Sequence, residues 1–261
     1  RFINCGICEQ LMSSMACGLS KVGKRVITYS ISVFPTLRCI EQIRNDICYH
    51  NSNVLITTSG AGFSYGSLGI SHHCTEDISM LRCIPNLLIC SPASSEETEI
   101  CMSRILKLKS PCYLRLDKTN AKSFVLEQKS HFGPFIHKHP KNKNYLLLAH
   151  GSTLEIYNQT IKEFPEIIDE VTIASVPFLK SNNQLHNLLI THKNIITTEE
   201  HQLAGGFGSF INEEMNICSS KAKLIRFGLN TFSDKVGSQS YLRNLYLPSP
   251  KNLHEIIKSS S

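Results

Sequence analysis

Short apolar runs and amphipathic segments alternate along the first half of the chain. The apolar runs have the length and the β-branched content of strands, and they fall at residues 25–30, 54–57, 87–90 and 112–116. Before the first run, apolar side chains recur every fourth position, at Ile7, Leu11, Met15 and Leu19. This spacing predicts a helix that packs by that face.

Helices are also predicted between the later runs. Apolar periodicity covers residues 37–47 and 75–83, and a Ser94–Glu97 capping box begins a helix that reaches about Leu108. A glycine-rich loop is predicted at 60–69. Strands that alternate with helices in this way predict a mainly parallel sheet covered by helices.

A polar, lysine-rich stretch follows, in which Gly133-Pro134 and His139-Pro140 interrupt any periodicity, and it predicts an interdomain linker at 119–143. A second alternating unit comes after it. Its predicted strands are 145–149, 171–175, 194–198 and 223–227, and its predicted helices are 152–163, 183–191 and 206–215. The expected fold class is therefore α/β, with two successive three-layer domains at 1–118 and 144–261.

Composition narrows the class of protein. With 261 residues, of which 41% are hydrophobic, the chain can bury two modest cores. The net charge of +6 is spread over scattered lysines without interleaved aromatics, which argues against nucleic-acid binding. No apolar run reaches the roughly 18 residues of a membrane span, and the first residues lack the zones of a secretion signal, so we expect a cytoplasmic protein with no membrane partner.

The cysteines do not suggest disulfides or a metal. Their number, 11, is odd, and ten of them fall between Cys5 and Cys112, so we expect reduced and mostly buried thiols. Cys5 and Cys8 have the C-x-x-C spacing, but no second pair has ligand spacing. We therefore expect no metal ligands in this chain.

Several motifs occur in a fixed order. They are Phe2-Ile3-Asn4-Cys5-Gly6-Ile7-Cys8-Glu9-Gln10, the segment Ser32–Arg44, the loop Gly60–His73, Thr197–Gly208, and Gly237-Ser238-Gln239. In sequence and order they resemble the transketolase family, which includes deoxyxylulose phosphate synthases and the split transketolases encoded as two subunits. The resemblance implies a pyrimidine-binding domain, incomplete at its N-terminus, followed by the family's C-terminal domain.

The resemblance implies that Glu9 is catalytic and binds the cofactor, thiamine diphosphate. This cofactor must lose a proton from its thiazolium carbon, and its own amino group serves as the base. A carboxyl group hydrogen-bonded to the aminopyrimidine ring makes that amino group basic enough. Without the motif, Glu9 would be interpreted as an acid stabilised by the helix dipole in a first turn.

Two further residues are assigned to the cofactor by the resemblance. Phe34 matches an aromatic residue that stacks on the aminopyrimidine and excludes water. Arg38 matches a basic residue on the succeeding helix. The alternatives are that Phe34 belongs to the core and that Arg38 is an ordinary surface charge.

The resemblance assigns His72, His73 and Lys118 to substrate. His72 matches the imidazole near the reacting carbon, which can donate to an oxyanion or relay a proton. Lys118 matches a phosphate-binding basic residue, and it could equally be a solvated charge. The chain departs from transketolases proper at two positions, because Leu68 replaces a substrate-reading Asp and Gly60 replaces a phosphate-binding His. Sugar preference is therefore not carried over.

The family holds the cofactor's diphosphate through Mg²⁺ on a separate domain with a Gly-Asp-Gly motif, which this sequence lacks. We therefore expect a diphosphate-binding partner that supplies the Mg²⁺ ligands, in a dimer or another homo- or hetero-oligomer. The chain is expected to be a fragment or a shortened gene product. The expected function is transfer of a two-carbon ketol unit between sugars, with sugar phosphates favoured. The alternatives are a deoxyxylulose phosphate synthase-like enzyme and a truncated, non-catalytic remnant.

Overall fold

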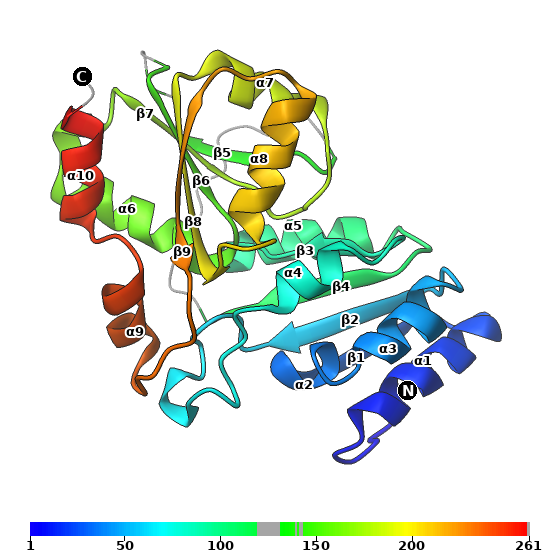
Figure 1. Cartoon of the computed structure of the whole chain (residues 1–261). Coiled ribbons are helices and arrows are strands. Elements are labelled where there is room, and N and C mark those ends of the chain that lie inside the picture. The colour runs from blue at the N-terminus through cyan, green and yellow to red at the C-terminus, as the bar shows by residue number, and fades with distance from the viewer. Residues whose placement is uncertain (119–130, 139, 141–142, 260–261) are drawn as a thin grey trace.

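The computed structural model describes residues 1–118, 131–138, 140 and 143–259, which form two sheets with helices packed against them (Figure 1). The first sheet has four strands in the order β1-β2-β4-β3, and every pair in it is parallel. Its strands are β1 (Val26–Ile31), β2 (Val54–Ser59), β3 (Leu88–Cys90) and β4 (Cys112–Leu116). Its helices are α1 (Glu9–Lys21), α2 (Val33–Thr36), α3 (Ile40–Gln42), the π-helical turn η1 (Ile43–Cys48), the 3-10 turn η2 (Gly66–Leu68), α4 (Asp77–Arg82) and α5 (Ser95–Ile105).

The second sheet has five strands in the order β5-β7-β6-β8-β9, and only β5 runs antiparallel to its neighbour. Its strands are β5 (Phe135–Lys138), β6 (Tyr145–Ala149), β7 (Val171–Ser175), β8 (Asn194–Gln202) and β9 (Lys223–Leu229). Its helices are the 3-10 turns η3 (Gly151–Thr153) and η4 (Pro165–Ile167), and α6 (Leu154–Glu163), α7 (Asn183–Thr191), α8 (Phe207–Ile217), α9 (Gln239–Tyr246) and α10 (Pro250–Ser259). The predicted α/β class with mainly parallel sheets is confirmed.

Strand β5 lies within the linker that the sequence predicted at 119–143. Phe135 and Ile136 are buried, and they pair with Ser175 and Ala174 of β7. The polar residues around this short strand hide it from a search for apolar runs. The remainder of the linker prediction falls largely at 119–130, 139 and 141–142, which lie outside the described residues.

Helix α1 corrects the predicted packing face. Ile7 and Leu11 are 90% and 59% exposed, whereas Ala16 and Cys17 are buried. Small side chains allow a helix to approach its neighbours closely, and most of the buried residues of α1 are small. The predicted Ser94 cap of α5 is confirmed, because its hydroxyl accepts the backbone N–H of Glu97.

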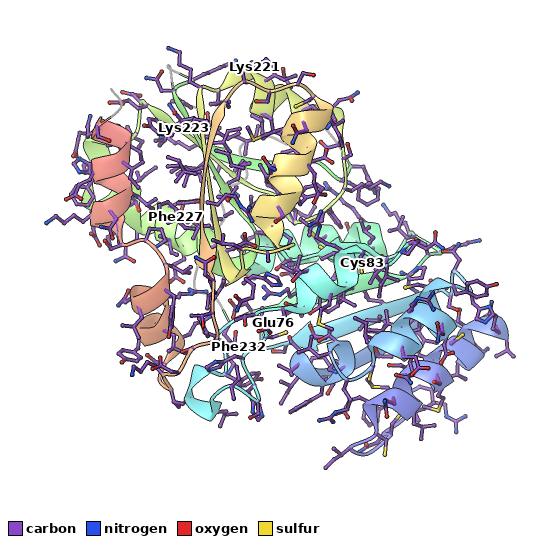
Figure 2. The ribbon with its side chains drawn as sticks, viewed as in Figure 1. Glu76, Cys83, Lys221, Lys223, Phe227 and Phe232 are labelled. Carbon is purple, nitrogen blue, oxygen red and sulfur yellow. The ribbon has the colours of Figure 1, made fainter. Side chains whose placement is uncertain are left out.

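In the second unit, α6 and α10 cover one face of the sheet and α7 and α8 the other, as Figure 1 shows. Phe227 of β9 packs against the cluster on the α6 side, while Lys221 and Lys223 are exposed near the start of the strand (Figure 2). Among the described residues, no helix is long and apolar enough to span a bilayer. All eleven cysteines are free thiols.

Buried polar groups join the two units. The Asp77 carboxylate, at the start of α4, accepts from the Arg115 Nε at 2.7 Å and from the Tyr113 hydroxyl at 2.7 Å. His201 of β8 accepts the Ile78 backbone N–H through Nε2 at 3.1 Å. Because its Nδ1 lies 2.8 Å from the Gln202 carbonyl oxygen, this nitrogen carries the proton. A neutral histidine of one unit thus caps a helix of the other.

This arrangement predicts that acid weakens the fold. Burial lowers the pKa of His201 to about 4 and that of His150 to about 3. Between these values and the ordinary pKa of about 6.5, the unfolded chain binds more protons, so the free energy of unfolding falls as pH drops below 6.5. The loss from His201 alone should be about 2 kcal/mol at pH 5.

Chemical denaturation at pH 7.5 and pH 5 measures this loss. His201→Gln keeps a hydrogen-bond acceptor without a titrating ring, and we expect it to show a smaller pH dependence than the wild type. The control is His50→Gln, since His50 is exposed. Equal slopes for His201→Gln and the wild type would contradict the assignment of a neutral, buried His201.

Candidate active site

Four of the residues predicted for the site form one continuous row of contacts. The Arg38 Nη1 donates to the Glu9 Oε2 at 3.1 Å, and its guanidinium carbon lies 4.9 Å from the centre of the Phe34 ring. The Phe34 ring in turn meets the His72 ring edge-on, with 5.4 Å between their centres. Three segments that are distant in sequence thus converge at the end of the first sheet.

Glu9 is the first residue of α1 and is 8% exposed. Its Oε2 binds Arg38, and within the described part of the chain its Oε1 makes no hydrogen bond. The helix dipole favours a negative charge at this position, as the alternative interpretation holds. A carboxylate that is paired through one oxygen can still accept a hydrogen bond from a ligand at the other oxygen.

Phe34 and Arg38 differ in exposure. Phe34 lies on α2 and is half-buried, so it is not a fully enclosed core residue. The Arg38 side chain is 50% exposed. Its cation therefore stacks on an aromatic ring, pairs with an acid and still reaches solvent.

The structure separates the two histidines of the loop. His72 is half-buried, and its Nδ1 lies 3.0 Å from the Ser71 hydroxyl. His73 is 2% exposed, and its Nε2 donates to the Gly66 carbonyl oxygen at 3.2 Å. Its ring packs edge-on against Phe63, with 5.1 Å between centres. Only His72 lies in the row that contains Glu9, and His73 instead supports the loop from inside.

Tyr65 connects the row to Lys118 and was not singled out from the sequence. The Lys118 Nζ lies 5.2 Å from the centre of the Tyr65 ring, which is 6.4 Å from that of His72. A Cβ on Gly60 would lie 2.5 Å from the Tyr65 Cδ2, and Gly60 has a φ of +105°. The Tyr65 ring therefore occupies the space into which a side chain at position 60 would extend. A glycine at position 60 followed by an aromatic residue at position 65 was the sequence pattern that could have indicated Tyr65.

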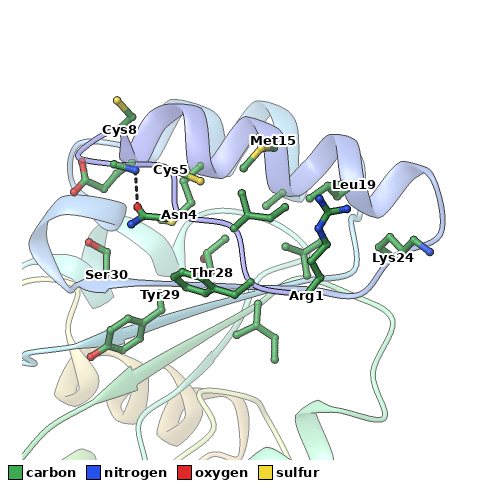
Figure 3. Close-up of a pocket in the computed structure, with 18 of the residues that line it drawn as sticks. Arg1, Asn4, Cys5, Cys8, Met15, Leu19, Lys24, Thr28, Tyr29 and Ser30 are labelled. Carbon is green, nitrogen blue, oxygen red and sulfur yellow. Dashed lines mark hydrogen bonds between the residues drawn. The ribbon is translucent and has the colours of Figure 1, made fainter.

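A cavity of about 630 Å³ lies between α1, β1 and the first residues of the chain (Figure 3). Glu9 lines it, together with apolar side chains of α1 such as Met12, Met15 and Leu19. Phe34 and His72 do not line it. The cavity therefore does not coincide with the row of predicted site residues.

The glycine-rich turn at 205–208 does not offer a nucleotide site. The Glu199 carboxylate accepts the backbone N–H groups of Phe207 at 2.6 Å and Gly208 at 2.9 Å, and it so occupies the N-terminus of α8. A Cβ on Gly208 would lie 2.5 Å from the Arg226 Nε. A close-packed turn therefore links β8 to α8. Across 1–118, 131–138, 140 and 143–259, no group of His, Cys, Asp and Glu side chains could hold a metal ion.

Known proteins resemble this chain in sequence and in fold. Residues 1–123 match the family model described as "Transketolase, pyrimidine binding domain". One subunit of the apulose-4-phosphate transketolase of Actinobacillus succinogenes is 32% identical over 216 residues, which are 82% of this chain and 69% of that protein. The 1-deoxy-D-xylulose-5-phosphate synthase of Lawsonia intracellularis is 30% identical over 94% of this chain, which spans 39% of the synthase.

A solved structure described as "Split gene transketolase, inactive beta4 tetramer" superposes with a TM-score of 0.83 at 25% identity. The match covers 99% of this chain and 83% of that one.

Proposed function

The chain belongs to the transketolase family as a transketolase-type subunit, and from this premise we propose that it transfers a two-carbon ketol unit between sugars together with a diphosphate-binding partner. The observation that carries the proposal is the row of contacts from Glu9 through Arg38 and Phe34 to His72. It puts an acid, a stacking ring and an imidazole of the types that the chemistry requires within one site.

Proteins of this family use thiamine diphosphate, which supplies a carbon nucleophile when bound. The residues present fit its aminopyrimidine end. The Oε1 of Glu9 can accept from a protonated ring nitrogen, and the half-buried Phe34 offers an aromatic face. The described residues do not fit the diphosphate end, since no cluster of metal ligands is found among them. We propose that Mg²⁺ and its ligands belong to the partner, since this sequence lacks the family's Gly-Asp-Gly motif.

The roles that we propose for this chain's residues are consistent with their positions. Glu9 accepts a hydrogen bond from the aminopyrimidine at the buried end of the row, where Arg38 keeps the carboxylate in place. His72 lies next to Phe34 and can donate to an oxygen of the substrate. Lys118 provides a positive charge for a phosphate group, with Tyr65 between it and His72. We also propose that 1–118 and 144–261 are the two domains, with β5 as a strand of the second sheet that precedes the second range.

One observation favours a second candidate function, that of a deoxyxylulose phosphate synthase-like enzyme. The identity to a 1-deoxy-D-xylulose-5-phosphate synthase extends over 94% of this chain. Leu68, which is 54% exposed within the loop that carries His72, has no polar side-chain atom that could bind a substrate hydroxyl. The donor could then be a 2-oxoacid rather than a ketose, and a donor comparison in the reconstituted enzyme distinguishes the two.

The test is titration calorimetry of thiamine diphosphate with Mg²⁺ into this chain, alone and mixed with a diphosphate-binding subunit. That subunit is to be chosen by its Gly-Asp-Gly motif from the genes next to this chain's gene. We expect heat of binding only in the mixture, because the two ends of the cofactor need both chains. Absence of binding in the mixture, with both proteins folded, would favour a non-catalytic remnant.

A further inference from the structure

The loop from Gly60 to His73, here called the His72 loop, is held by the second unit. The Phe63 backbone N–H donates to the Oε1 of Glu200, a β8 residue, at 2.6 Å. The Phe63 side chain packs in a cluster with Leu229, Leu242 and Tyr246. Figure 1 shows α9 beside this loop, in agreement with the contacts between α9 and η2. The geometry of His72 thus depends on residues that follow it by well over a hundred positions.

The Glu200 side chain lies so close to the His72 loop that it restricts which residue can occupy position 62. A Cβ on Gly62 would lie 2.6 Å from the Glu200 Cγ, and Gly62 has a φ of +55°. The carboxylate is 4% exposed. A buried charge in such a position must be balanced by partners that stay in place.

Those partners form a network that reaches Lys118. The Glu200 Oε2 accepts from the Arg243 Nε at 2.7 Å, and Gln239 also donates to this carboxylate, at 3.1 Å to Oε1. The Arg243 Nη2 binds Asp117 at 3.2 Å. Asp117 is the residue before Lys118, and it accepts the backbone N–H of Lys118 at 2.7 Å. One network therefore touches the backbone of both candidate substrate segments.

From these contacts we infer that Glu200 is a positioning residue, which fixes the His72 loop and, through Arg243 and Asp117, the start of the Lys118 segment. The inference rests on the proposed function for its catalytic consequence only. Glu200 does not touch the substrate in this scheme. Its effect is to hold the imidazole and the ammonium at a constant separation while the substrate binds.

Hydrogen exchange of the isolated chain tests the positioning, without any cofactor. Glu200→Ala removes the acceptor of the Phe63 N–H, and we expect the amides of the His72 loop to exchange about tenfold faster or more, while those of β2 keep their protection. Glu200→Gln keeps one acceptor oxygen and should give an intermediate rate. The matched control is Glu214→Ala. Glu214 lies on α8, is equally buried at 4%, and pairs with His186 of α7 at 2.7 Å.

Steady-state kinetics in the reconstituted enzyme tests the consequence. Glu200→Ala should lower kcat and raise KM for the phosphorylated substrate, with partial recovery in Glu200→Gln, while Glu214→Ala keeps both constants. Unchanged loop exchange in Glu200→Ala, or equal acceleration in Glu214→Ala, overturns the inference. An inactive wild-type mixture with a loosened loop in Glu200→Ala would reject the proposed function and leave the positioning in place.

Discussion

Glu9→Gln is expected to abolish most ketol transfer and to leave the fold intact. An amide cannot exchange the proton that a carboxyl group shares with the aminopyrimidine, so turnover of the reconstituted enzyme should fall by about 10²- to 10⁴-fold. The folded chain should tolerate the change, because Arg38 keeps half of its side chain in solvent once its partner is neutral. Steady-state turnover and the midpoint of chemical denaturation measure the two effects.

The matched control for this variant is Glu41→Gln, which changes an exposed acid on the short helix α3. Turnover of Glu41→Gln should equal that of the wild type. Wild-type turnover in Glu9→Gln, at equal cofactor saturation, would contradict the role of Glu9 and favour the alternative of an acid that only stabilises the first turn of α1. Lost turnover with an unfolded chain would show that Glu9 is needed for the fold.

Asp77→Asn is expected to destabilise the protein more than any surface change. The Arg115 side chain is 4% exposed and Asp77 is fully buried, so the substitution leaves an uncompensated buried guanidinium. Breaking such a pair costs about 3–5 kcal/mol, a large part of the 5–15 kcal/mol that is usual for a whole domain. The free energy of unfolding by urea is the measurement.

Two further variants make the result specific. Asp234→Asn breaks an exposed pair with Lys235 and should leave the unfolding transition unchanged. The double variant Asp77→Asn with Arg115→Met removes both charges and should recover part of the loss. A single variant as stable as the wild type would mean that water or rearranged groups solvate Arg115.

Although burial alone raises the pKa of Asp77, Arg115 holds this pKa below its usual value. The contribution of the pair to stability should therefore persist down to about pH 4.

The fold was predictable where strands are buried on both faces. The predicted bounds of Cys112–Leu116, Tyr145–Ala149 and Asn183–Thr191 are those observed, because buried parallel strands and an amphipathic helix leave strong apolar patterns. The helix predicted at 37–47 proved to be irregular. It is divided at Cys39, whose φ of −109° is not helical, and continues into the π-helical turn η1.

Parts of the site were not predictable from local sequence. Resemblance indicated Glu9, Phe34, Arg38, His72 and Lys118, and their roles stay predictions. It gave no sign that His73 would be turned inward. The direction in which each of two adjacent loop residues points depends on the path of the loop, which the sequence does not show. Tyr65 and Glu200 were missed because each acts through a distant partner. Glu200 meets Phe63 across 137 positions of sequence, and no local pattern encodes such a contact.

That separation bears on the order in which the protein is made. A ribosome completes the His72 loop long before it adds β8 and α9, and domains generally fold from the N-terminus as they emerge. The first sheet can form early, since its strand contacts are comparatively short in range. The loop that carries His72 must then wait for the second unit, so the site would be the last part of the nascent chain to become ordered.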